Sequence, residues 1–460
     1  MQTLTPPGPQ SALLGWDLLA RLRSNPLAYL MDTAHQYGDI TYAHVMGLHV
    51  YLLNNPDYIH EVFVTQASKF YKWKGSEKRL GESLLGNGLI RNDGESWKRQ
   101  RRLVQPSLHA KRIEAYGQIM VENTLRMLES WQDGETRAID VDMMKLTLSV
   151  LTKSLFDVDS SQEAEDIGEA LDILQRLLPM QAQAFISLPD WVPTPMNRKL
   201  QAATQKLDEI VVRIINRRRS EPTEKGDLLA MLITAGDDDG TRMSDKQLRD
   251  EVMTLLIAGY ETAASTLTWL WYLLSQHPDI EAKLHQEVDS VLANQLPTVQ
   301  DLARMPYVDM IVREVLRCYP PAWLVGRQPI EDVLIGPYCI PTGSLILISP
   351  YLTHHTAAYF AEPDRFMPER FEENAPQPYP RHAYFPFTDG PRICAGNAFA
   401  MMEARLVLAL ISQRFRLSLV PGQKIELAPG VTLRSRYGMQ MRVERRQASS
   451  ASMGGPVLTA

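Results

Sequence analysis

Residues 385–396 read Phe-Pro-Phe-Thr-Asp-Gly-Pro-Arg-Ile-Cys-Ala-Gly. The two glycines, with a proline between them, predict a tightly turned loop that leads into a helix over about 397–413. Cys394 would lie just ahead of that helix, where the helix dipole and the free N–H groups favour a thiolate. Such a thiolate can serve as a nucleophile or as a metal ligand. A buried thiol without chemistry is the plain alternative.

The composition of the whole chain sets broad limits. Its 460 residues suggest roughly three domains by length, at about 150 residues each. With 45% hydrophobic and 22% charged residues the chain is globular, and a net charge of −6 gives no reason to expect nucleic-acid binding. Three cysteines without a C-x-x-C pair exclude a disulfide framework and favour a reducing compartment, so we expect a cytoplasmic protein. Neither a signal peptide nor an apolar run of the ~20 residues needed for a membrane anchor occurs.

The remaining sequence is mostly helical in pattern. Residues 40–53 predict a two-stranded ribbon, and strand-like pieces return at 328–348 and 415–443. The longest predicted helix runs over 244–277, with Ser244 as its N-cap, and it is apolar on nearly all sides. We therefore expect that helix to be buried through the middle of a mainly α protein with small antiparallel sheets.

The cysteine segment carries a specific resemblance. Phe387-x-x-Gly390-x-Arg392-x-Cys394-x-Gly396 resembles the haem-binding signature of the cytochrome P-450 family of haem-thiolate monooxygenases. The resemblance implies that Cys394 is the axial iron ligand of haem b, with Phe387 and Gly396 beside the cofactor.

The same resemblance implies an overall organisation. It implies one triangular domain over 1–445, with the haem between the long central helix and the cysteine loop. The small and polar residues at the end of the chain predict a disordered tail over 446–460. Too few residues follow Cys394 for a fused flavin reductase, so electrons are expected from a separate ferredoxin or flavodoxin with its reductase. A monomer is expected.

A second motif is Glu314-Val315-Leu316-Arg317, whose charges share one helix face at i, i+3. Taken alone, an exposed ion pair of little energetic value explains it. The resemblance implies instead that Glu314, Arg317 and Arg370 form a buried triad behind the haem, where loss of one partner would strand a charge.

A third motif lies in the central helix, at Ala258-Gly259-Tyr260-Glu261-Thr262. Glycine inside a helix indicates a distortion or a close approach of another segment. A carboxylate beside a hydroxyl on an apolar helix indicates a specific role, because an unpaired buried carboxylate is costly. A threonine that only bonds its own helix backbone is the plain alternative. By resemblance, Thr262 supports oxygen activation and proton delivery, and Glu261 feeds the proton relay.

Several cations match the family's haem-propionate contacts. Trp97 and Arg101 are four residues apart on one predicted helix face, and Arg392 and Arg327 are further candidates. The neighbouring cations would face outward, either as a solvated basic surface or as a docking patch for an acidic redox partner; they are Lys98, Arg99, Arg102, Lys111 and Arg112. His354 and His355 have no partner at metal-site spacing and are expected to be ordinary residues.

The substrate is expected to be lipophilic and small, because the positions that align with the family's pocket are almost wholly apolar. They are Leu84, Leu85, Leu89, Leu178, Phe185, Leu255, Ala258, Trp323, Leu324, Val325 and Leu433. Resemblance to fatty-acid-hydroxylating branches favours a fatty acid that takes one oxygen atom from O2, and a terpenoid or a steroid is the alternative. A haem sensor without turnover, which the Glu261–Thr262 pair argues against, and a haem-free binding protein are the remaining alternatives.

Overall fold

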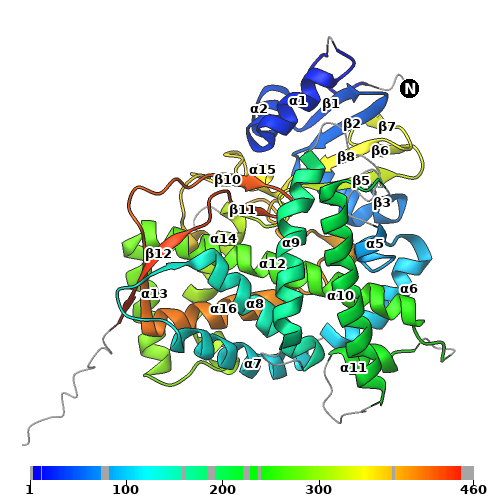
Figure 1. The fold of residues 1–460 in the computed structure, drawn as a ribbon. Coiled ribbons are helices and arrows are strands. Elements are labelled where there is room, and N and C mark those ends of the chain that lie inside the picture. Colours follow the sequence, from blue (N-terminus) through cyan, green and yellow to red (C-terminus); the bar gives the residue numbers. More distant parts are fainter. Residues whose placement is uncertain are drawn as a thin grey trace, which may run out of the picture.

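Helix α12 (Asp245–Gln276) runs through the centre of the molecule in the computed structural model (Figure 1). The structure describes residues 4–11, 13–73, 82–108, 110–157, 162–183, 192–220, 228–236, 240–375 and 379–446. In outline the molecule is roughly triangular: a narrow upper part of two helices and a sheet stands on a broad helical base (Figure 1).

The described helices account for most of that base. They are α1 (Trp16–Ser24), α2 (Pro26–Tyr37), α3 (Pro56–His60), α5 (Glu82–Leu85), α6 (Gly94–Val104), α7 (Ala110–Glu129), α8 (Ile139–Phe156), α9 (Gln162–Gln183), α10 (Pro195–Ser220), α11 (Leu228–Thr234), α12, α13 (Pro278–Leu292), α14 (Pro306–Cys318), α15 (Pro350–His354) and α16 (Asn397–Arg414). Short turns of other helical types are η1 (Glu61–Thr65), η2 (Ala67–Lys69), η3 (Gln105–Leu108), η4 (Gln300–Arg304), η5 (Pro368–Phe371) and η6 (Gly390–Arg392).

The strands form four small sheets. They are β1 (Ile40–Val45), β2 (Leu48–Leu53), β3 (Phe70–Lys72), β4 (Thr136–Ala138), β5 (Val325–Pro329), β6 (Val333–Ile335), β7 (Tyr338–Ile340), β8 (Leu345–Ile348), β9 (Phe415–Leu419), β10 (Leu427–Pro429), β11 (Leu433–Ser435) and β12 (Gln440–Arg445). Their orders are β1-β2-β8-β5-β3, β4-β12-β9, β6-β7 and β10-β11. The ribbon predicted over 40–53 is the β1–β2 pair, with Ile40 opposite Leu53. Unlike the antiparallel pairing expected throughout, β2 and β8 pair in parallel, because they come from distant parts of the chain and no hairpin joins them.

Helix α12 confirms the prediction of a buried central helix. Ser244 caps it, since the side-chain oxygen accepts a hydrogen bond from the Gln247 N–H at 3.2 Å. Its apolar side chains enter two separate core clusters, one with α7, α13, α14 and α16 and one with α5, α6, α9 and α10. At Gly259 the helix approaches α8 so closely that a Cβ would lie 3.0 Å from both Leu151 methyl carbons. Glycine there permits close packing, and the helix continues without a break.

None of the helices among the described residues is both long and apolar enough to cross a bilayer.

Candidate active site

The cysteine loop is closed by its own backbone. The Cys394 N–H donates to the Phe387 carbonyl at 3.0 Å, and the Ile393 N–H donates to the Gly390 carbonyl at 3.1 Å. Gly390 has φ of 69°, and a Cβ there would lie 1.9 Å from the Phe63 carbonyl oxygen of η1, so only glycine fits. Helix α16 starts three residues after Cys394, which matches the predicted loop and helix.

The Cys394 thiol faces an internal space. Its side chain is accessible to solvent, yet surrounding protein desolvates it and raises its pKa, while the Gly396 N–H and Arg101 oppose that rise. In the free protein, desolvation of the Cys394 sulfur therefore outweighs the helix dipole, which by itself would favour the thiolate. A metal ion on the sulfur would reverse this balance, because a coordinating thiol is deprotonated outright. A Cβ built on the adjacent Gly396 would meet no atom within 4 Å, so the space extends beside the loop.

Two arginines near this space lack an anionic partner among the described residues. Arg327 on β5 is 6% exposed, donates only to the Gly326 carbonyl at 3.0 Å and lies over the Phe63 ring at 5.0 Å. Burial lowers its pKa to about 10. Arg101 on α6 is half-buried, and burial lowers its pKa while the Cys394 sulfur opposes that shift. Unpaired buried guanidinium groups are costly, so this arrangement fits the two propionates of a haem.

Arg392 is held differently. Its guanidinium pairs with the Asp93 carboxylate at 2.5 Å, donates to the Asn92 carbonyl at 3.2 Å and stacks 4.3 Å from the centroid of the Trp97 ring. The pair joins the cysteine loop to the start of α6, which carries both Trp97 and Arg101. Arg327 lies close enough to this pair for the charges of Arg392 and Asp93 to affect its pKa in opposite directions.

One face of α12 stays open in the middle of the molecule. Leu255, Ala258 and Thr262 are half-buried, although most of their neighbours in the helix are buried. Their spacing of three and four residues puts them on one helix face. The Thr262 hydroxyl donates to the Ala258 carbonyl of its own helix at 2.8 Å. Thr262 thus bonds the backbone of its own helix, as the plain alternative expected. Its side chain nevertheless lies on the open face of α12.

Glu261 points to a different part of the site. Its carboxylate accepts a hydrogen bond from the Thr432 hydroxyl at 2.5 Å and pairs with the Arg434 guanidinium at 3.3 Å. Neither partner was singled out from the sequence. They belong to the β10–β11 region, far along the chain from Glu261. The sequence indicates only that a buried carboxylate needs hydrogen-bond donors, and it does not indicate which residues supply them.

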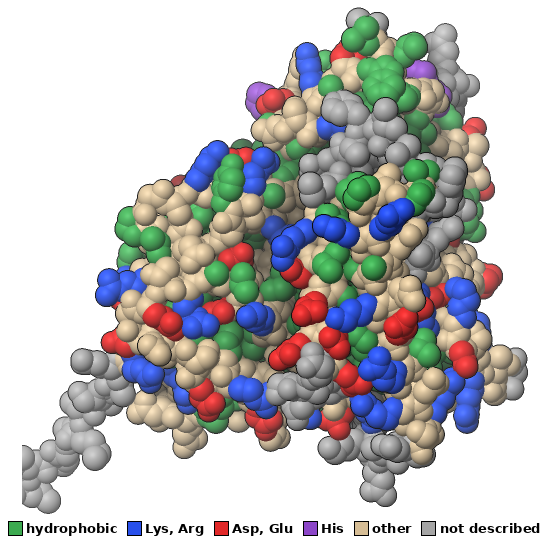
Figure 2. Space-filling view, in the orientation of Figure 1, with side chains coloured by type: hydrophobic (Ala, Val, Ile, Leu, Met, Phe, Trp, Pro, Cys, Tyr) green, Lys and Arg blue, Asp and Glu red, His purple; other side chains and the backbone are tan. Residues whose placement is uncertain are grey.

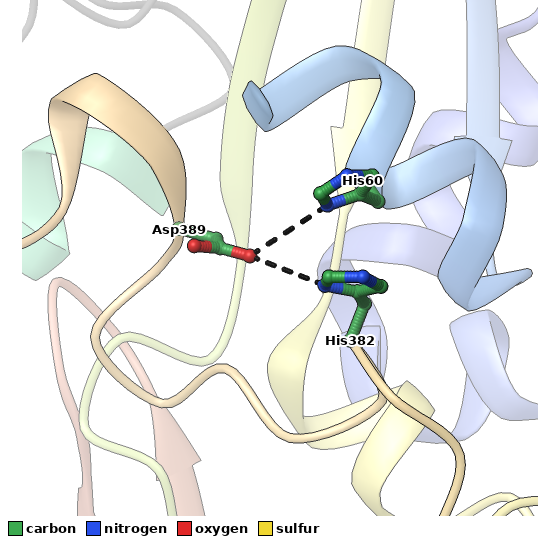
Figure 3. Close-up of side chains that lie close together, drawn as sticks. All are labelled: His60, His382 and Asp389. Carbon is green, nitrogen blue, oxygen red and sulfur yellow. Dashed lines mark ion pairs between the residues drawn. The ribbon is translucent and has the colours of Figure 1, made fainter. Parts of the chain in front are cut away.

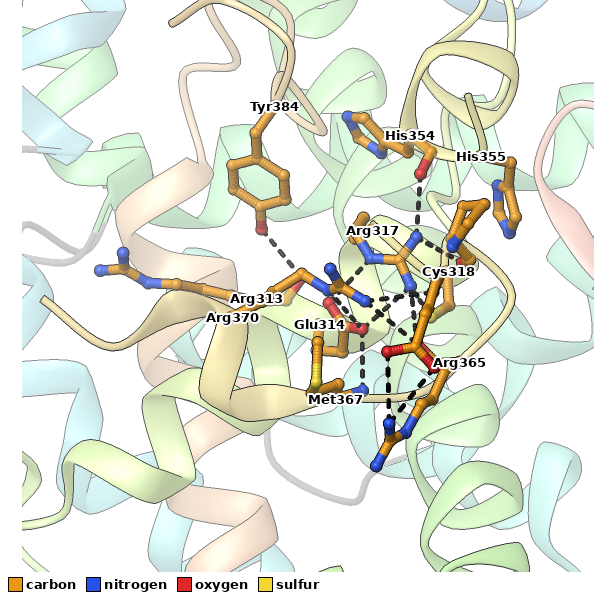
Figure 4. Close-up of polar contacts among 12 residues, drawn as sticks. Arg313, Glu314, Arg317, Cys318, His354, His355, Arg365, Met367, Arg370 and Tyr384 are labelled. Carbon is orange, nitrogen blue, oxygen red and sulfur yellow. Dashed lines mark hydrogen bonds and ion pairs between the residues drawn. The ribbon is translucent and has the colours of Figure 1, made fainter. Parts of the chain in front are cut away.

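In the Glu314 cluster, Arg317 and Arg370 converge on one carboxylate (Figure 4). Arg317 is bidentate on Glu314 at 2.8 and 2.9 Å, and the Arg370 Nε donates to the same carboxylate at 3.1 Å. The Met367 N–H adds a fourth hydrogen bond at 2.9 Å. Glu314 and Arg317 are both 0% exposed. The remaining donors of Arg317 bind the carbonyls of His354 and Pro363 at 2.9 and 2.8 Å, so the cluster is satisfied within the protein.

Comparison with known proteins gives one consistent result. The family model described as Cytochrome P450 matches residues 6–438. The chain belongs to the cytochrome P450 family. Cyclooctatin synthase from Streptomyces melanosporofaciens is 37% identical, with 90% of each chain covered, and Cyclooctat-9-en-7-ol 5-monooxygenase from the same organism is 32% identical, with 86% of each covered. Pentalenene oxygenase from Streptomyces avermitilis is 29% identical, with 94% of each covered.

Solved structures agree with the sequence comparison. The haem domain of cytochrome P450DA has a TM-score of 0.86 at 26% identity, and the match covers 96% of this chain and 98% of that one. The mainly helical P450 fold expected from the sequence is thereby confirmed. As a P450, the protein is a monooxygenase whose family uses haem b with a cysteine thiolate ligand, a small lipophilic substrate, O2 and redox partners.

The residues expected to line the P450 substrate pocket belong to several packing clusters, and their contact with one pocket stays a prediction. Leu84, Leu85, Leu89 and Leu255 belong to the cluster around α5, α6 and α10, whereas Trp323, Leu324 and Leu433 pack with α2 and α15. Val325 packs against the upper sheet and Ala258 lies on the open face of α12. Leu433 is 0% exposed and packs in the core. Its carbonyl oxygen accepts hydrogen bonds from the Ser265 hydroxyl and the Trp269 indole N–H, which hold β11 against α12. The Leu178 side chain and all of Phe185 lie outside the described residues.

A groove of about 2090 Å³ opens beside α12. It lies between α2, α8, α9 and the β10–β11 hairpin, and Figure 2 shows it as a hollow near the centre of this view. Of the expected pocket residues, Trp323 and Leu324 line it. Tyr260 and Ala264 line it too, and so do Ser265 and Trp269, which follow Thr262 by three and seven residues and therefore lie on the same side of α12 as Thr262. Arg434 also lines it, which connects the groove to the Glu261 carboxylate.

The cations around α6 are only partly outward-facing. Lys98 is exposed and pairs with Glu95 at 2.6 Å, and Arg102 is exposed. Arg99 was expected outside but is half-buried, because it donates to the Gln247 side chain at 3.0 Å and bridges α6 to α12. The side chains of Lys111 and Arg112 lie outside the described part of the chain.

His354 has a structural role that the sequence did not indicate. Its side chain is 0% exposed, and its Nε2 accepts the Phe385 N–H at 3.1 Å, at the start of the cysteine loop. Burial lowers its pKa well below the usual value, so it stays neutral. His354 therefore links α15 to the cysteine loop, while its carbonyl oxygen accepts from Arg317.

Proposed function

We propose that Cys394 binds haem b as a thiolate and that the enzyme hydroxylates a terpenoid. The single observation that supports the site is the Cys394 thiol facing an internal space beside two arginines, Arg101 and Arg327, that have no anionic partner among the described residues. The support for the substrate class comes from relatives named for cyclooctatin and pentalenene.

In this proposal each residue around Cys394 has a defined task. Arg101, Arg327 and Trp97 bind the propionates by charge and hydrogen bonding, and Arg392 contributes through its stacking on Trp97. Gly396 leaves room for the macrocycle and Phe387 fixes the loop through its carbonyl. The Glu314–Arg317–Arg370 cluster holds α14 and η5 together and takes no part in the chemistry.

When bound, haem b supplies dioxygen activation and the oxidation of an unactivated C–H bond. One oxygen atom of O2 enters the substrate and the other leaves as water, with two electrons and two protons consumed. Leu255 and Ala258 offer an apolar surface for the substrate on the open face of α12. Thr262, on the same face, holds water through its hydroxyl, and Glu261 exchanges protons with solvent from the groove beside Arg434.

A fatty acid is the second candidate substrate. The sequence favoured it, and a relative named Ultra-long-chain fatty acid omega-hydroxylase from Homo sapiens is 30% identical, with 78% of this chain and 73% of that one covered. The three bacterial relatives named above cover more of this chain, and they support the terpenoid instead.

The ligation is tested with cysteine variants. In Cys394→Ser the reduced carbonyl complex is expected to lose the absorption typical of thiolate ligation. The matched control is Cys339→Ser, a half-buried free cysteine on β7, which should keep it. Retention of the thiolate spectrum in Cys394→Ser would disprove the assignment.

The substrate is tested with matched panels of cyclic terpenes and fatty acids. We expect terpenes to shift the Soret band and to give mono-oxygenated products by mass spectrometry when a ferredoxin and its reductase supply electrons. Shifts and products from fatty acids alone would reverse the order of the two candidates.

The other expectations stay predictions. They are a ferredoxin or flavodoxin as the specific electron donor, a monomeric state, a cytoplasmic location and one functional domain over 1–445. Lys98 and Arg102 are the described exposed cations that an acidic donor could contact near α6.

A further inference from the structure

Two histidines and an aspartate meet beside the cysteine loop (Figure 3). His60 is the last residue of α3, whereas His382 and Asp389 belong to the segment that leads to Cys394. The Asp389 Oδ2 lies 3.5 Å from the Nδ1 of His382 and 3.9 Å from the Nδ1 of His60. The three atoms all lie within 4.8 Å of one another, and the two imidazole rings stack with centroids 3.7 Å apart.

One of these donor atoms is left unsatisfied. The Nδ1 of His60 is shielded from solvent and makes no hydrogen bond with any described residue. A buried polar atom without a partner is costly, and the atom is directed at the Asp389 carboxylate (Figure 3). The other Asp389 oxygen, Oδ1, already accepts the Gly390 N–H at 2.7 Å. Oδ2 therefore remains the oxygen available for a third partner.

We propose that His60, His382 and Asp389 bind a divalent transition-metal ion, with zinc as the best match. Two imidazole nitrogens and one carboxylate oxygen suit zinc, whereas calcium and magnesium prefer oxygen ligands alone. Zinc lies about 2.0–2.2 Å from such donors, so three donors around it stand roughly 3–3.5 Å apart. The observed distances need small side-chain movements to reach that geometry. Since all three residues are partly exposed, water completes the coordination.

The position of the site gives the ion a structural consequence. Asp389 is followed by Gly390, which packs against the Phe63 carbonyl of η1, the turn that directly continues α3 from His60. An ion held by His60 and Asp389 would fasten α3 to the loop that carries Cys394. The ion would stabilise the folded loop in proportion to the logarithm of the zinc concentration above the dissociation constant.

The test measures zinc binding to the holoenzyme, in which haem occupies Cys394, by competition with a chromophoric chelator. All samples carry His49→Ala, because the His44 and His49 rings lie 5.4 Å apart and form another candidate zinc-binding pair. The ligand variants are His60→Ala, His382→Ala and Asp389→Asn, of which the last keeps an oxygen that can accept the Gly390 N–H. The matched control is the exposed His35→Ala.

We expect one equivalent of zinc in the background protein and in the His35→Ala control, and at least tenfold weaker binding in each ligand variant. Cobalt should give tetrahedral d–d absorption in the background protein that the His60→Ala variant lacks. An unchanged Soret spectrum identifies variants that remain folded. Zinc binding of equal strength in folded ligand variants, or the absence of one-equivalent binding in the background protein, would overturn the proposal.

Discussion

Two groups of arginines in this protein have opposite surroundings. Around Glu314, the guanidinium groups of Arg317 and Arg370 share one carboxylate and donate their other hydrogen bonds to backbone carbonyls, so both groups have partners within the protein (Figure 4). Around Cys394, Arg101 and Arg327 have no carboxylate partner among the described residues. A compensated cluster supports the fold, and an uncompensated one is complementary to an anion that the protein does not supply.

The largest expected effect breaks the compensated cluster. Glu314→Gln leaves two buried guanidinium groups without their counter-charge, so the free energy of unfolding should fall by about 3–5 kcal/mol. Urea denaturation followed by fluorescence measures it. A loss below about 1 kcal/mol would mean that the cluster resembles an exposed ion pair.

Glu403 extends the comparison, because it is a buried acid that pairs with no cation among the described residues. Glu403 on α16 is 2% exposed, its Oε1 has no hydrogen-bond partner among the described residues, and burial raises its pKa to about 8. The folded protein therefore holds this proton between about pH 4.5 and 8 while the unfolded chain releases it, so stability falls as the pH rises through that range. In Glu403→Gln the loss of unfolding free energy between pH 5 and pH 8 should be smaller by up to a few kcal/mol. Urea denaturation at pH 5, 6.5 and 8 measures it. Parallel curves for both proteins would contradict the assignment.

The next effect is expected at the uncompensated cluster. Arg327→Leu should leave the unfolding free energy of the haem-free protein unchanged or higher, because it removes an unpaired buried charge. Haem should dissociate about 10–100-fold faster, as expected for the loss of a charge-assisted hydrogen bond worth about 1.5–3 kcal/mol. Haem transfer to apomyoglobin measures the rate. Lys98→Met is the control, since its side chain is 62% exposed and pairs with Glu95. Unchanged haem retention in Arg327→Leu would exclude a propionate contact.

The smallest expected effect calibrates the first. Glu362 and Arg365 form an ion pair at 3.3 Å next to the Glu314 cluster, but their side chains are 63% and 61% exposed. Glu362→Gln should change the free energy of unfolding by less than about 1 kcal/mol, because solvent screens exposed pairs. The same urea experiment tests this prediction. If Glu362→Gln lowered the free energy of unfolding as much as Glu314→Gln, burial could not explain why the two ion pairs differ.

Local patterns predicted the parts of the fold that depend on neighbours in the chain. The cap at Ser244, the long apolar helix after it and the loop before α16 all follow from short-range chemistry. Gly259 indicated a close approach, but only packing identified Leu151 as the neighbour. The partners of Glu261 could not be predicted, since Thr432 and Arg434 lie about 170 residues further along and share no local pattern with it.

The same division applies to the candidate sites. By itself, the sequence determined the family, and it predicted Cys394 and the Glu261–Thr262 pair as site residues, because the spacing within each motif is a property of the chain. Only the tertiary structure decided which arginines stay unpaired, that Arg99 turns inward to Gln247, and that His60 meets His382 and Asp389. The physical reason is that compensation and desolvation depend on distances between segments that are remote in sequence, and packing alone sets those distances.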